Sequence, residues 1–167
     1  LITGIAGFLG SHLSEKLIDL GHTIVGVDNM VGGYKDNIPK EIEFHEVDCC
    51  DFPKIKKIMK NIDVVYHCAA TAHEGLSVFS PYEITRNNYL ASVSIFSAAI
   101  NEKVKRVIFC SSMARYGDQQ TPFTENMKTK PVDPYGISKV AAEDVLKSLC
   151  ELNNIEWVIA VPHNIIG

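Results

Sequence analysis

The sequence has no long hydrophobic run and no excess of positive charge. None of its apolar stretches approaches the roughly 20 residues that a bilayer-spanning helix needs. Lys and Arg number 16 against 20 Asp and Glu, which gives a net charge of −4. A chain that binds nucleic acid by neutralising phosphates usually carries the opposite balance. The composition therefore predicts neither a membrane partner nor a nucleic-acid partner.

The sequence also lacks a cysteine pattern typical of disulfides or metal sites. The five cysteines, Cys49, Cys50, Cys68, Cys110 and Cys150, are odd in number and form no C-x-x-C pair. This spacing argues against a disulfide framework and against a zinc site, and no metal is predicted. A reduced, cytoplasmic setting fits best. We expect all five cysteines to act as small buried apolar side chains.

An initiator Met and a signal peptide are missing as well. The chain opens on Leu1-Ile2-Thr3, which has the character of a strand already under way, and it closes shortly after another apolar run. Its 167 residues, 46% of them hydrophobic, suit one domain with one core. We expect residues 1–167 to be one domain truncated at both ends, with the larger missing piece behind.

Short apolar runs alternate with longer amphipathic stretches along the chain. The runs at 1–3, 23–28, 42–48, 63–70, 106–112 and 155–161 are close to continuously apolar, as strands buried on both faces should be. Helices are predicted over 8–20, 53–61, 81–101 and 134–153. Gly21 would stop the first, and Asp133 would cap the last with Pro134 at its first position. This order predicts an α/β, doubly wound parallel sheet with helices on both faces.

The first predicted turn carries three evenly spaced glycines. Gly4-Ile5-Ala6-Gly7-Phe8-Leu9-Gly10 lies between a strand and a helix, where glycine lets backbone approach a pyrophosphate at the helix N-terminus. Asp28 ends the next strand, near the ~20-residue spacing of a ribose-binding acid, with Asn29 beside it. Such a carboxylate favours NAD over NADP and indicates a Rossmann-type domain. The alternatives are an ordinary turn and a solvated loop aspartate.

A second group of residues suggests proton chemistry. Tyr135 and Lys139 stand at i and i+4, so on a helix they share one face. An adjacent ammonium and an oxidised nicotinamide would both favour the phenolate, and we expect them to lower the pKa of Tyr135 so that this residue can act as a base. Ser111 and Ser112 end the fifth strand and can bond the same substrate oxygen. The alternatives are surface helix residues and turn serines.

The ordered set of glycine turn, strand-end acid, strand-end serine and Y-x-x-x-K resembles the extended short-chain dehydrogenase/reductases over essentially the whole chain. Phe109-Cys110-Ser111-Ser112-Met113-Ala114-Arg115-Tyr116-Gly117 is similar to F-S-S-S-A-x-x-Y-G of the UDP-glucose 4-epimerase group. The resemblance implies that Ser112, Tyr135 and Lys139 are catalytic, that Ser112 and Tyr135 also bind substrate, and that Tyr135 and Lys139 also contact NAD. A C-terminal substrate lobe is expected to be absent.

The resemblance also implies the remaining contacts. The cofactor positions are Gly4, Gly7, Phe8, Leu9, Gly10, Asp28, Asn29, Asp48, Cys49, Cys68, Ala69, Ala70, Thr71, Asn87 and Pro162. Phe8 and Leu9 correspond to pyrophosphate contacts, Asp48 and Cys49 to adenine contacts, and residues 68–71 to the nicotinamide side. Asn164 corresponds to a substrate-diphosphate contact. Asn88 begins the family's N-V-x-G-T motif, and this sequence departs from it with Asn88-Tyr89-Leu90-Ala91-Ser92.

The reaction implied is NAD-dependent epimerisation of a nucleotide sugar, most simply a UDP-hexose, at C4 through a 4-keto intermediate. Related dehydratases carry an acidic pair where this chain has Met113 and Ala114, which have no titratable group. The alternatives are another epimerase, a reductase or a dehydratase of the same family, or a non-catalytic NAD-binding protein. His73 and Glu74 are candidates either for substrate contact or for a solvated or capping role. A homodimer through the helices at 81–101 and 134–153 is expected, and the isolated chain is predicted to bind NAD weakly with little activity.

Overall fold

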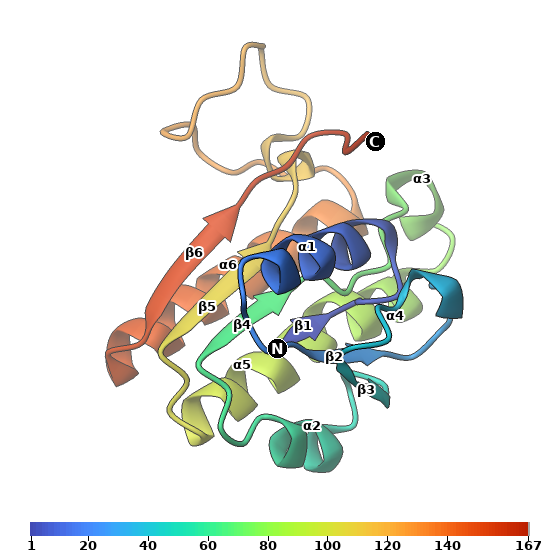
Figure 1. The fold of residues 1–167 in the computed structure, drawn as a ribbon. Helices are drawn as coiled ribbons and strands as arrows, with labels where there is room; N and C mark the ends of the chain where they lie inside the picture. The colour runs from blue at the N-terminus through green and yellow to red at the C-terminus, as the bar shows by residue number, and fades with distance from the viewer. Residues whose placement is uncertain (167) are drawn as a thin grey trace.

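The computed structural model describes residues 1–166 and contains one six-stranded sheet in the order β3-β2-β1-β4-β5-β6 (Figure 1). Every neighbouring pair is parallel. The strands are β1 (Ile2–Thr3), β2 (Val25–Asp28), β3 (Glu43–Glu46), β4 (Val64–His67), β5 (Arg106–Cys110) and β6 (Glu156–Ala160). This is the strand order of a Rossmann sheet, so the predicted fold class is confirmed.

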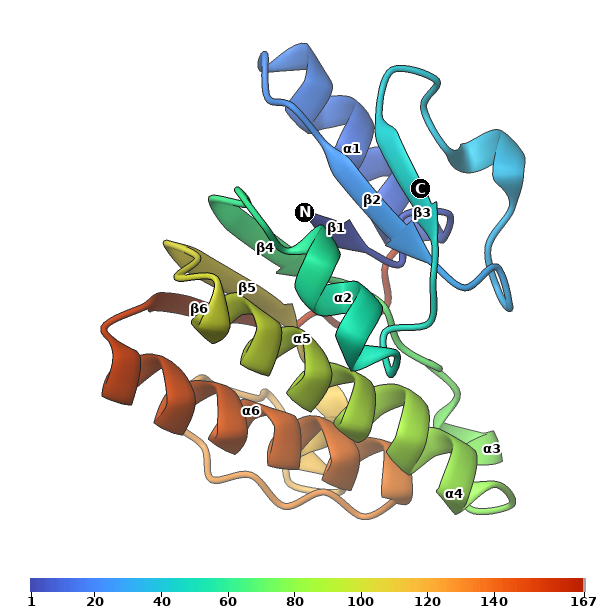
Figure 2. The same ribbon diagram turned by 90° about the horizontal axis from the view of Figure 1, so that it is seen from below.

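Helices cover both faces of the sheet, as predicted. On one face, α1 (Phe8–Asp19) packs against Ile2, Ile5 and Ile24. On the other face lie α2 (Phe52–Ile58), α5 (Ala91–Asn101) and α6 (Pro134–Asn153), which Figure 2 shows side by side beneath the strands. The order strand, helix, strand requires such crossovers because parallel neighbours cannot be joined by a tight hairpin.

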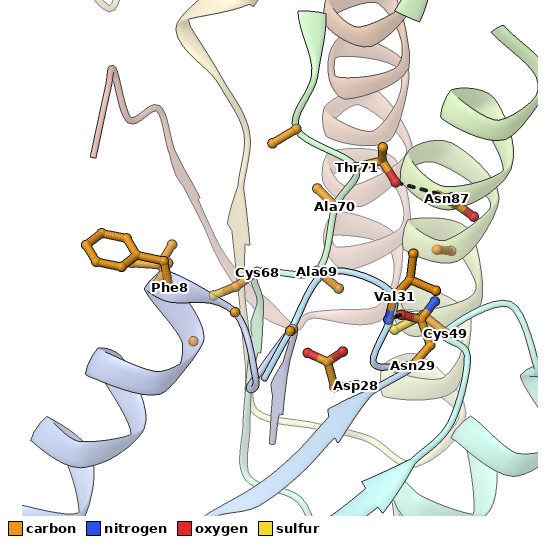
Figure 3. Close-up of a pocket in the computed structure, with 18 of the residues that line it drawn as sticks. Phe8, Asp28, Asn29, Val31, Cys49, Cys68, Ala69, Ala70, Thr71 and Asn87 are labelled. Carbon is orange, nitrogen blue, oxygen red and sulfur yellow. Dashed lines mark hydrogen bonds between the residues drawn. The ribbon is translucent and has the colours of Figure 1, made fainter. Parts of the chain in front are cut away.

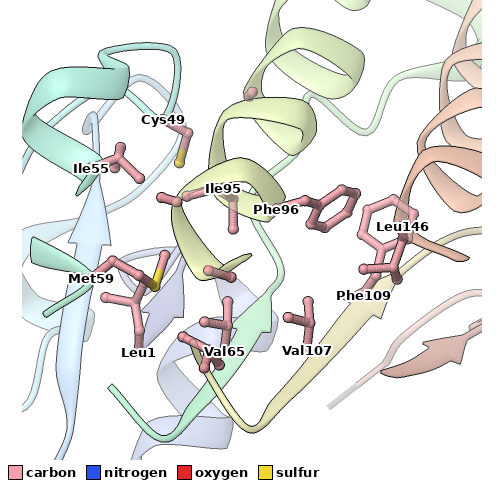
Figure 4. Packing of buried hydrophobic residues seen from close by; sticks show 14 of the residues in the cluster. Leu1, Cys49, Ile55, Met59, Val65, Ile95, Phe96, Val107, Phe109 and Leu146 are labelled. Carbon is pink, nitrogen blue, oxygen red and sulfur yellow. The ribbon is translucent and has the colours of Figure 1, made fainter. Parts of the chain in front are cut away.

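The larger core lies between the sheet and α2, α5 and α6. Val65 and Phe109 of the sheet meet Ile95 and Phe96 of α5 and Leu146 of α6 (Figure 4). All five side chains are fully buried. Burying an aliphatic or aromatic side chain of this size contributes about 1.5–3 kcal/mol. The core therefore fixes α6 against the end of β5, which is where the predicted serines and the Y-x-x-x-K segment meet.

The predicted start of α6 is confirmed in detail. Asp133 is its N-cap, and the Asp133 carboxylate accepts a hydrogen bond of 2.8 Å from the Gly136 amide. Pro134 occupies the first helical position, where its missing N–H has no intrahelical partner to lose. Gly21 follows α1 with φ of 82°, the left-handed conformation that ends helices.

The helix predicted over 81–101 is confirmed in its bounds, but it is not α-helical throughout. The structure has α4 (Pro81–Ile84), a π-helical segment η2 (Thr85–Leu90) and then α5. The structure also contains three short elements that were not predicted: α3 (Glu74–Ser77) and two 3₁₀ turns, η1 (Lys35–Asn37) and η3 (Met113–Tyr116). π-helical turns occur frequently at functional sites, and η2 borders the cavity described below.

Two further expectations need correction. The two edge strands, β3 and β6, are not buried on both faces, and none of their residues is buried. In β3 the two glutamates at its ends are exposed, and Phe44 and His45 between them are partly covered. The cysteines are also not uniformly buried, since Cys50, Cys68 and Cys110 are only partly covered. Within residues 1–166, no helix combines the length and the apolar character that crossing a membrane requires.

Candidate active site

A cavity of about 640 Å³ opens at the C-terminal ends of β1 and β4, where the strand order reverses direction (Figure 3). Ligands of open α/β sheets bind at this position, and the volume falls in the usual range of about 300–1,000 Å³. Most of the residues predicted to contact the cofactor line it. They are Gly4, Gly7, Phe8, Leu9, Gly10, Asp28, Asn29, Asp48, Cys49, Cys68, Ala69, Ala70, Thr71 and Asn87.

The glycine turn needs its glycines for close packing. Gly4 has φ of 71°, and a Cβ there would lie 2.9 Å from the backbone of Ala69. A Cβ on Gly10 would lie 2.2 Å from the Gly4 carbonyl oxygen. The turn therefore lies directly against the backbone that follows β4. The first-turn amides of α1 have no intrahelical partners, and together with the helix dipole they favour an anion at this end of the cavity.

Asp28 joins the end of β2 to the glycine turn. Its Oδ2 accepts a hydrogen bond from the Ala6 amide at 3.0 Å, and its Oδ1 accepts one from the Met30 amide at 2.8 Å. The residue is only 8% exposed. The carboxylate is thereby held at the cavity wall in one orientation, and each oxygen keeps a further lone pair for a ligand hydroxyl.

Asp48 lies at the other end of the cavity wall, beyond β3. Its Oδ2 accepts from Arg86 Nη2 at 2.8 Å, and its Oδ1 accepts from the Cys50 amide at 2.8 Å. Partial burial acts to raise the pKa of Asp48, but the bonds from Cys50 and Arg86 outweigh it and lower this pKa. Because Arg86 belongs to η2, the ion pair ties the π-helical segment to the cavity.

A buried hydrogen-bond chain supports the backbone that follows β4. The Ala69 amide donates to Thr3 Oγ1 at 3.2 Å, and Thr3 Oγ1 lies 2.7 Å from His67 Nδ1. His67 Nε2 lies 2.9 Å from Ser92 Oγ, whose hydroxyl donates to the Asn88 carbonyl. Ser92 must therefore accept from His67, so Nε2 carries a proton. Complete burial lowers the pKa of His67 to about 3, so the imidazole is neutral at pH 7 and its Nδ1 accepts from Thr3.

Asn88, the neighbour of the predicted Asn87, fixes the backbone at Thr71, where the stretch 68–71 ends. The Thr71 amide donates to Asn88 Oδ1 at 2.8 Å, and Asn88 Nδ2 donates to the Thr71 carbonyl at 3.2 Å. Asn87 lines the cavity, and its Nδ2 donates to Thr71 Oγ1 at 3.2 Å. Both asparagines belong to η2, so this segment holds the cavity wall through two successive residues.

Ser112, Tyr135 and Lys139 form a second group that adjoins the cavity. Lys139 Nζ lies 5.9 Å from the centre of the Tyr135 ring and donates to the Cys110 carbonyl at 2.8 Å. The Ser112 hydroxyl lies near enough to the Tyr135 phenol to act to lower its pKa. Cys110 in turn contacts Cys68 of the cavity wall, with the sulfur atoms 3.7 Å apart. The three side chains therefore converge beside the cavity, on the side of residues 68–71.

The expected lowering of the Tyr135 pKa does not occur in this structure. Burial raises the pKa of Tyr135, and the negative charges of Glu74, Asp133 and Cys110 act in the same direction, while the nearby Ser112 hydroxyl opposes them. Burial lowers the pKa of Lys139 to about 8, although nearby Cys110, Cys68 and Glu143 act to raise it. The chain alone therefore keeps the phenol protonated at neutral pH.

The structure separates the two serines at the end of β5. The Ser111 hydroxyl donates to Glu143 Oε1, and Glu143 is completely buried on α6. The same carboxylate is 3.1 Å from Arg115 Nη2 of η3. Ser112 instead caps η3 by accepting from the Ala114 amide and faces Tyr135. Ser111 therefore belongs to a buried ionic cluster, and Ser112 alone is directed at the tyrosine.

The family model described as the NAD dependent epimerase/dehydratase family matches residues 1–167. The chain belongs to this family. It is 35% identical over 170 residues to a putative UDP-glucose 4-epimerase from Methanocaldococcus jannaschii, in a match that covers 100% of the chain and 56% of the relative. The chain spans about half the length of the curated relatives it matches.

Two solved structures of family members are similar throughout. A UDP-glucose 4-epimerase from Brucella ovis in complex with NAD has a TM-score of 0.93 at 31% identity, covering 98% of this chain and 51% of that one. A UDP-glucose 4-epimerase from Thermotoga maritima with UDP-glucose has a TM-score of 0.90 at 31% identity, covering 95% and 53%. The fold is therefore that of the family's N-terminal part.

Within this family fold, Val31, Gly32, Gly33, Ala72 and Ala91 line the cavity although the sequence did not predict them. His73, a candidate substrate contact, also lines it. Five predicted positions do not line it: the adjoining Ser112, Tyr135 and Lys139, and also Pro162 and Asn164. The glycine pair after Asp28 was a usable signal, because loops after strand ends approach ligands. Pro162 lies beside the serine segment, where its carbonyl accepts from the Met113 amide at 3.2 Å. Asn164 is exposed, and neither it nor Pro162 lines the cavity.

Proposed function

We propose that the full-length protein epimerises a UDP-hexose at C4, with NAD as the bound cofactor. One observation carries the proposal: Ser112, Tyr135 and Lys139 converge beside a cavity whose wall includes Asp28 and the glycine turn. A dinucleotide pocket next to a hydroxyl, a phenol and an ammonium has the parts needed to oxidise and re-reduce a sugar alcohol. The similar epimerases with NAD or UDP-glucose bound support this reading.

The residues of the cavity fit NAD. The glycine turn and the start of α1 would hold the pyrophosphate, since a Cβ at Gly10 would fill the space against Gly4 and disturb the turn. Asp28 would bond the hydroxyls of a ribose and disfavour a 2′-phosphate. Residues 68–71, fixed by Thr3 and Asn88, would form the wall on the nicotinamide side. When bound, NAD supplies a hydride acceptor that is restored within each turnover.

The chain's own groups would handle the proton. In the complex with oxidised nicotinamide, whose positive charge would favour the phenolate, Tyr135 Oη would take the proton of the sugar C4 hydroxyl and give it back in the second half of the reaction. Ser112 bonds the same oxygen and keeps it close to Tyr135. Lys139, held by the Cys110 carbonyl, would place an ammonium near the Tyr135 ring and could hold the nicotinamide ribose. Orientation of these groups accounts for much of the expected rate.

Elimination of water is a less suitable reaction for this site. A dehydratase needs an acid and a base after the serine, and η3 offers Met113 and Ala114 there. Glu143 on α6 is buried, bonded to Ser111 and paired with Arg115. Oxidation followed by re-reduction, without elimination, therefore suits the residues best.

The proposal is tested by incubating the full-length protein with UDP-galactose and NAD. Formation of UDP-glucose without accumulation of NADH supports an epimerase. Accumulation of NADH would instead indicate a dehydrogenase, and no change in any nucleotide sugar would indicate a non-catalytic NAD-binding protein. Tyr135→Phe, which removes the hydroxyl and keeps the ring, is the matched inactive control.

A cytoplasmic homodimer is part of the same proposal. α6 packs against both η2 and α5, and this helix pair leaves Tyr82, Leu90 and Ile137 exposed. Large apolar side chains on the outer side of packed helices are suited to a second copy of the same pair. Light scattering of the full-length protein should give twice the monomer mass, and a monomeric mass would reject the dimer.

A further inference from the structure

Cys68 and Cys110 lie side by side on neighbouring strands. The register pairs His67 of β4 with Phe109 of β5, so the next residue on each strand is a cysteine. Neighbouring strands are about 4.7–4.9 Å apart, which lies inside the Cα separation of roughly 4.4–6.8 Å found in disulfides. The two sulfur atoms are 3.7 Å apart. Bond formation thus requires a small approach of two side chains that already point at each other.

Reagents in the cavity can reach this pair of cysteines through Cys68. Cys68 lines the cavity beside the glycine turn (Figure 3), and both cysteines are partly exposed. The Lys139 ammonium is bonded to the Cys110 carbonyl. The contact with Cys68, and after it the charge of Lys139, lower the pKa of the Cys110 thiol against the effect of burial, which favours the nucleophilic thiolate.

The other three cysteines lack these features. Cys49 and Cys150 are buried. Burial raises the pKa of Cys49 to about 12 and that of Cys150 to about 11. Cys50 is partly exposed, but burial and the charge of Asp48 raise its pKa to about 11. A reagent selective for thiolates should therefore distinguish Cys110 from these three.

We propose that Cys68 and Cys110 are an oxidation site in which a hydroperoxide converts the two thiols into a disulfide across the wall of the cavity. The Cys110 thiolate attacks the peroxide oxygen, the O–O bond breaks, and the sulfur becomes a sulfenic acid as water or an alcohol leaves. The Cys68 thiol then attacks that sulfur, the S–S bond forms, and water leaves. Two thiols are oxidised and one peroxide is reduced.

Occupation of the cavity should control this reaction, a part of the inference that rests on the proposed function. Cys68 belongs to the wall that would face NAD, so a bound dinucleotide would cover it. Conversely, closing the sulfur atoms from 3.7 Å to about 2.05 Å pulls on residues 68–71. We expect saturating NAD to slow disulfide formation at least fivefold, and the disulfide to weaken NAD binding.

The experiment treats the full-length protein with hydrogen peroxide, alkylates the remaining thiols and maps the peptides by mass spectrometry. The expected result is a Cys68–Cys110 linked peptide that disappears on reduction, with Cys49 and Cys150 still alkylated. In Cys68→Ser, Cys110 should be trapped as a sulfenic acid by dimedone. Cys50→Ser, at a partly exposed cysteine that does not line the cavity, is the matched control and should form the linkage at the wild-type rate.

Two results would overturn the inference. Absence of the linked peptide when other cysteines are oxidised would show that the geometry does not lead to a bond. Equal sulfenic acid trapping at Cys110 and Cys50 in Cys68→Ser would remove the selectivity. Linkage in the absence of NAD does not depend on epimerase activity, so it stands or fails independently of the proposed reaction. A linkage rate unchanged by bound NAD would refute the link to the cavity.

Discussion

The Lys139 ammonium donates a 2.8 Å hydrogen bond to the backbone carbonyl of Cys110. This bond connects the first turns of α6 to the last residue of β5, the two segments that carry Tyr135 and Ser112. The lysine is 3% exposed, and burial lowers its pKa from 10.5 to about 8. A buried cation that costs stability is typical of a functional position, because folding alone would favour an apolar side chain there.

Lys139→Met is therefore expected to stabilise the fold while abolishing activity. Below pH 8 Lys139 is charged in both the native and the unfolded state, so the free energy of unfolding of the wild type is lowered by the full cost of burying the charge. Between pH 8 and 10.5 the native state releases the proton that the unfolded state keeps, and wild-type stability rises. The variant should be more stable at pH 7 by about 2–3 kcal/mol. Denaturant titrations at pH 7 and pH 9.5 should show that the difference in free energy of unfolding between the variant and the wild type is smaller at the higher pH.

The control for this comparison is Lys147→Met, at the other lysine of α6, whose side chain is 35% exposed. It should show no comparable gain at pH 7. If Lys139→Met proves less stable than wild type at pH 7 and the gap does not change with pH, the charge of Lys139 is not the destabilising feature.

Ser112→Ala and Ser111→Ala should have different effects, although the two residues are neighbours. Removing the Ser112 hydroxyl deletes a partner of Tyr135 and should lower kcat about 100-fold or more. Removing the Ser111 hydroxyl leaves the buried Glu143 carboxylate short of a donor and should lower the free energy of unfolding by about 1–3 kcal/mol. Steady-state kinetics and thermal unfolding of both variants distinguish them. Equal losses of kcat would mean that the two serines share one role.

Asp28→Asn should weaken NAD binding by about tenfold or more. The carboxylate accepts from two backbone amides at once, and an amide side chain can serve only one of them with its single oxygen. Isothermal titration of NAD measures the change. Asp36→Asn, on the exposed turn η1, is the control that removes the same charge nearby. Equal affinities for wild type and Asp28→Asn would contradict the role assigned to this carboxylate.

Gly10→Ala should disrupt the glycine turn, because its methyl group would sit 2.2 Å from the Gly4 carbonyl oxygen. Rigid backbone cannot move aside easily, so we expect loss of NAD affinity and a lower melting temperature. Gly75→Ala makes the same substitution where nothing lies within 4 Å of the added carbon, and it should be neutral or stabilising. NAD titration and thermal unfolding of the two variants provide the comparison. A Gly10→Ala protein that binds NAD normally would refute the close-packing argument.

The sequence predicted those features of the site that depend on residues close together in the chain. The glycine turn, Asp28 at the end of β2 and the i, i+4 pair of Tyr135 and Lys139 depend on spacings within one strand, turn or helix. The cap at Asp133 was predictable for the same reason. Their positions around one edge of the sheet follow from parallel strand order, so the cavity could be anticipated.

What sequence reasoning missed depends on contacts between distant segments. The chain from Ala69 through Thr3 and His67 joins β1, β4 and α5, and no local pattern announces it. The same holds for the bond between Ser111 and Glu143. The direction of the Tyr135 pKa shift depends on burial, which the Y-x-x-x-K spacing does not report.

The most direct test of the proposed reaction follows an isotope at the reacting carbon. UDP-galactose carrying deuterium at C4 is incubated with the full-length protein and NAD in ordinary water, and the product is analysed by NMR and mass spectrometry. Removal and return of the same hydrogen predicts UDP-glucose that keeps its deuterium at C4, with no NADH left over. Deuterium lost to water, or a substrate that remains UDP-galactose throughout, would contradict the account.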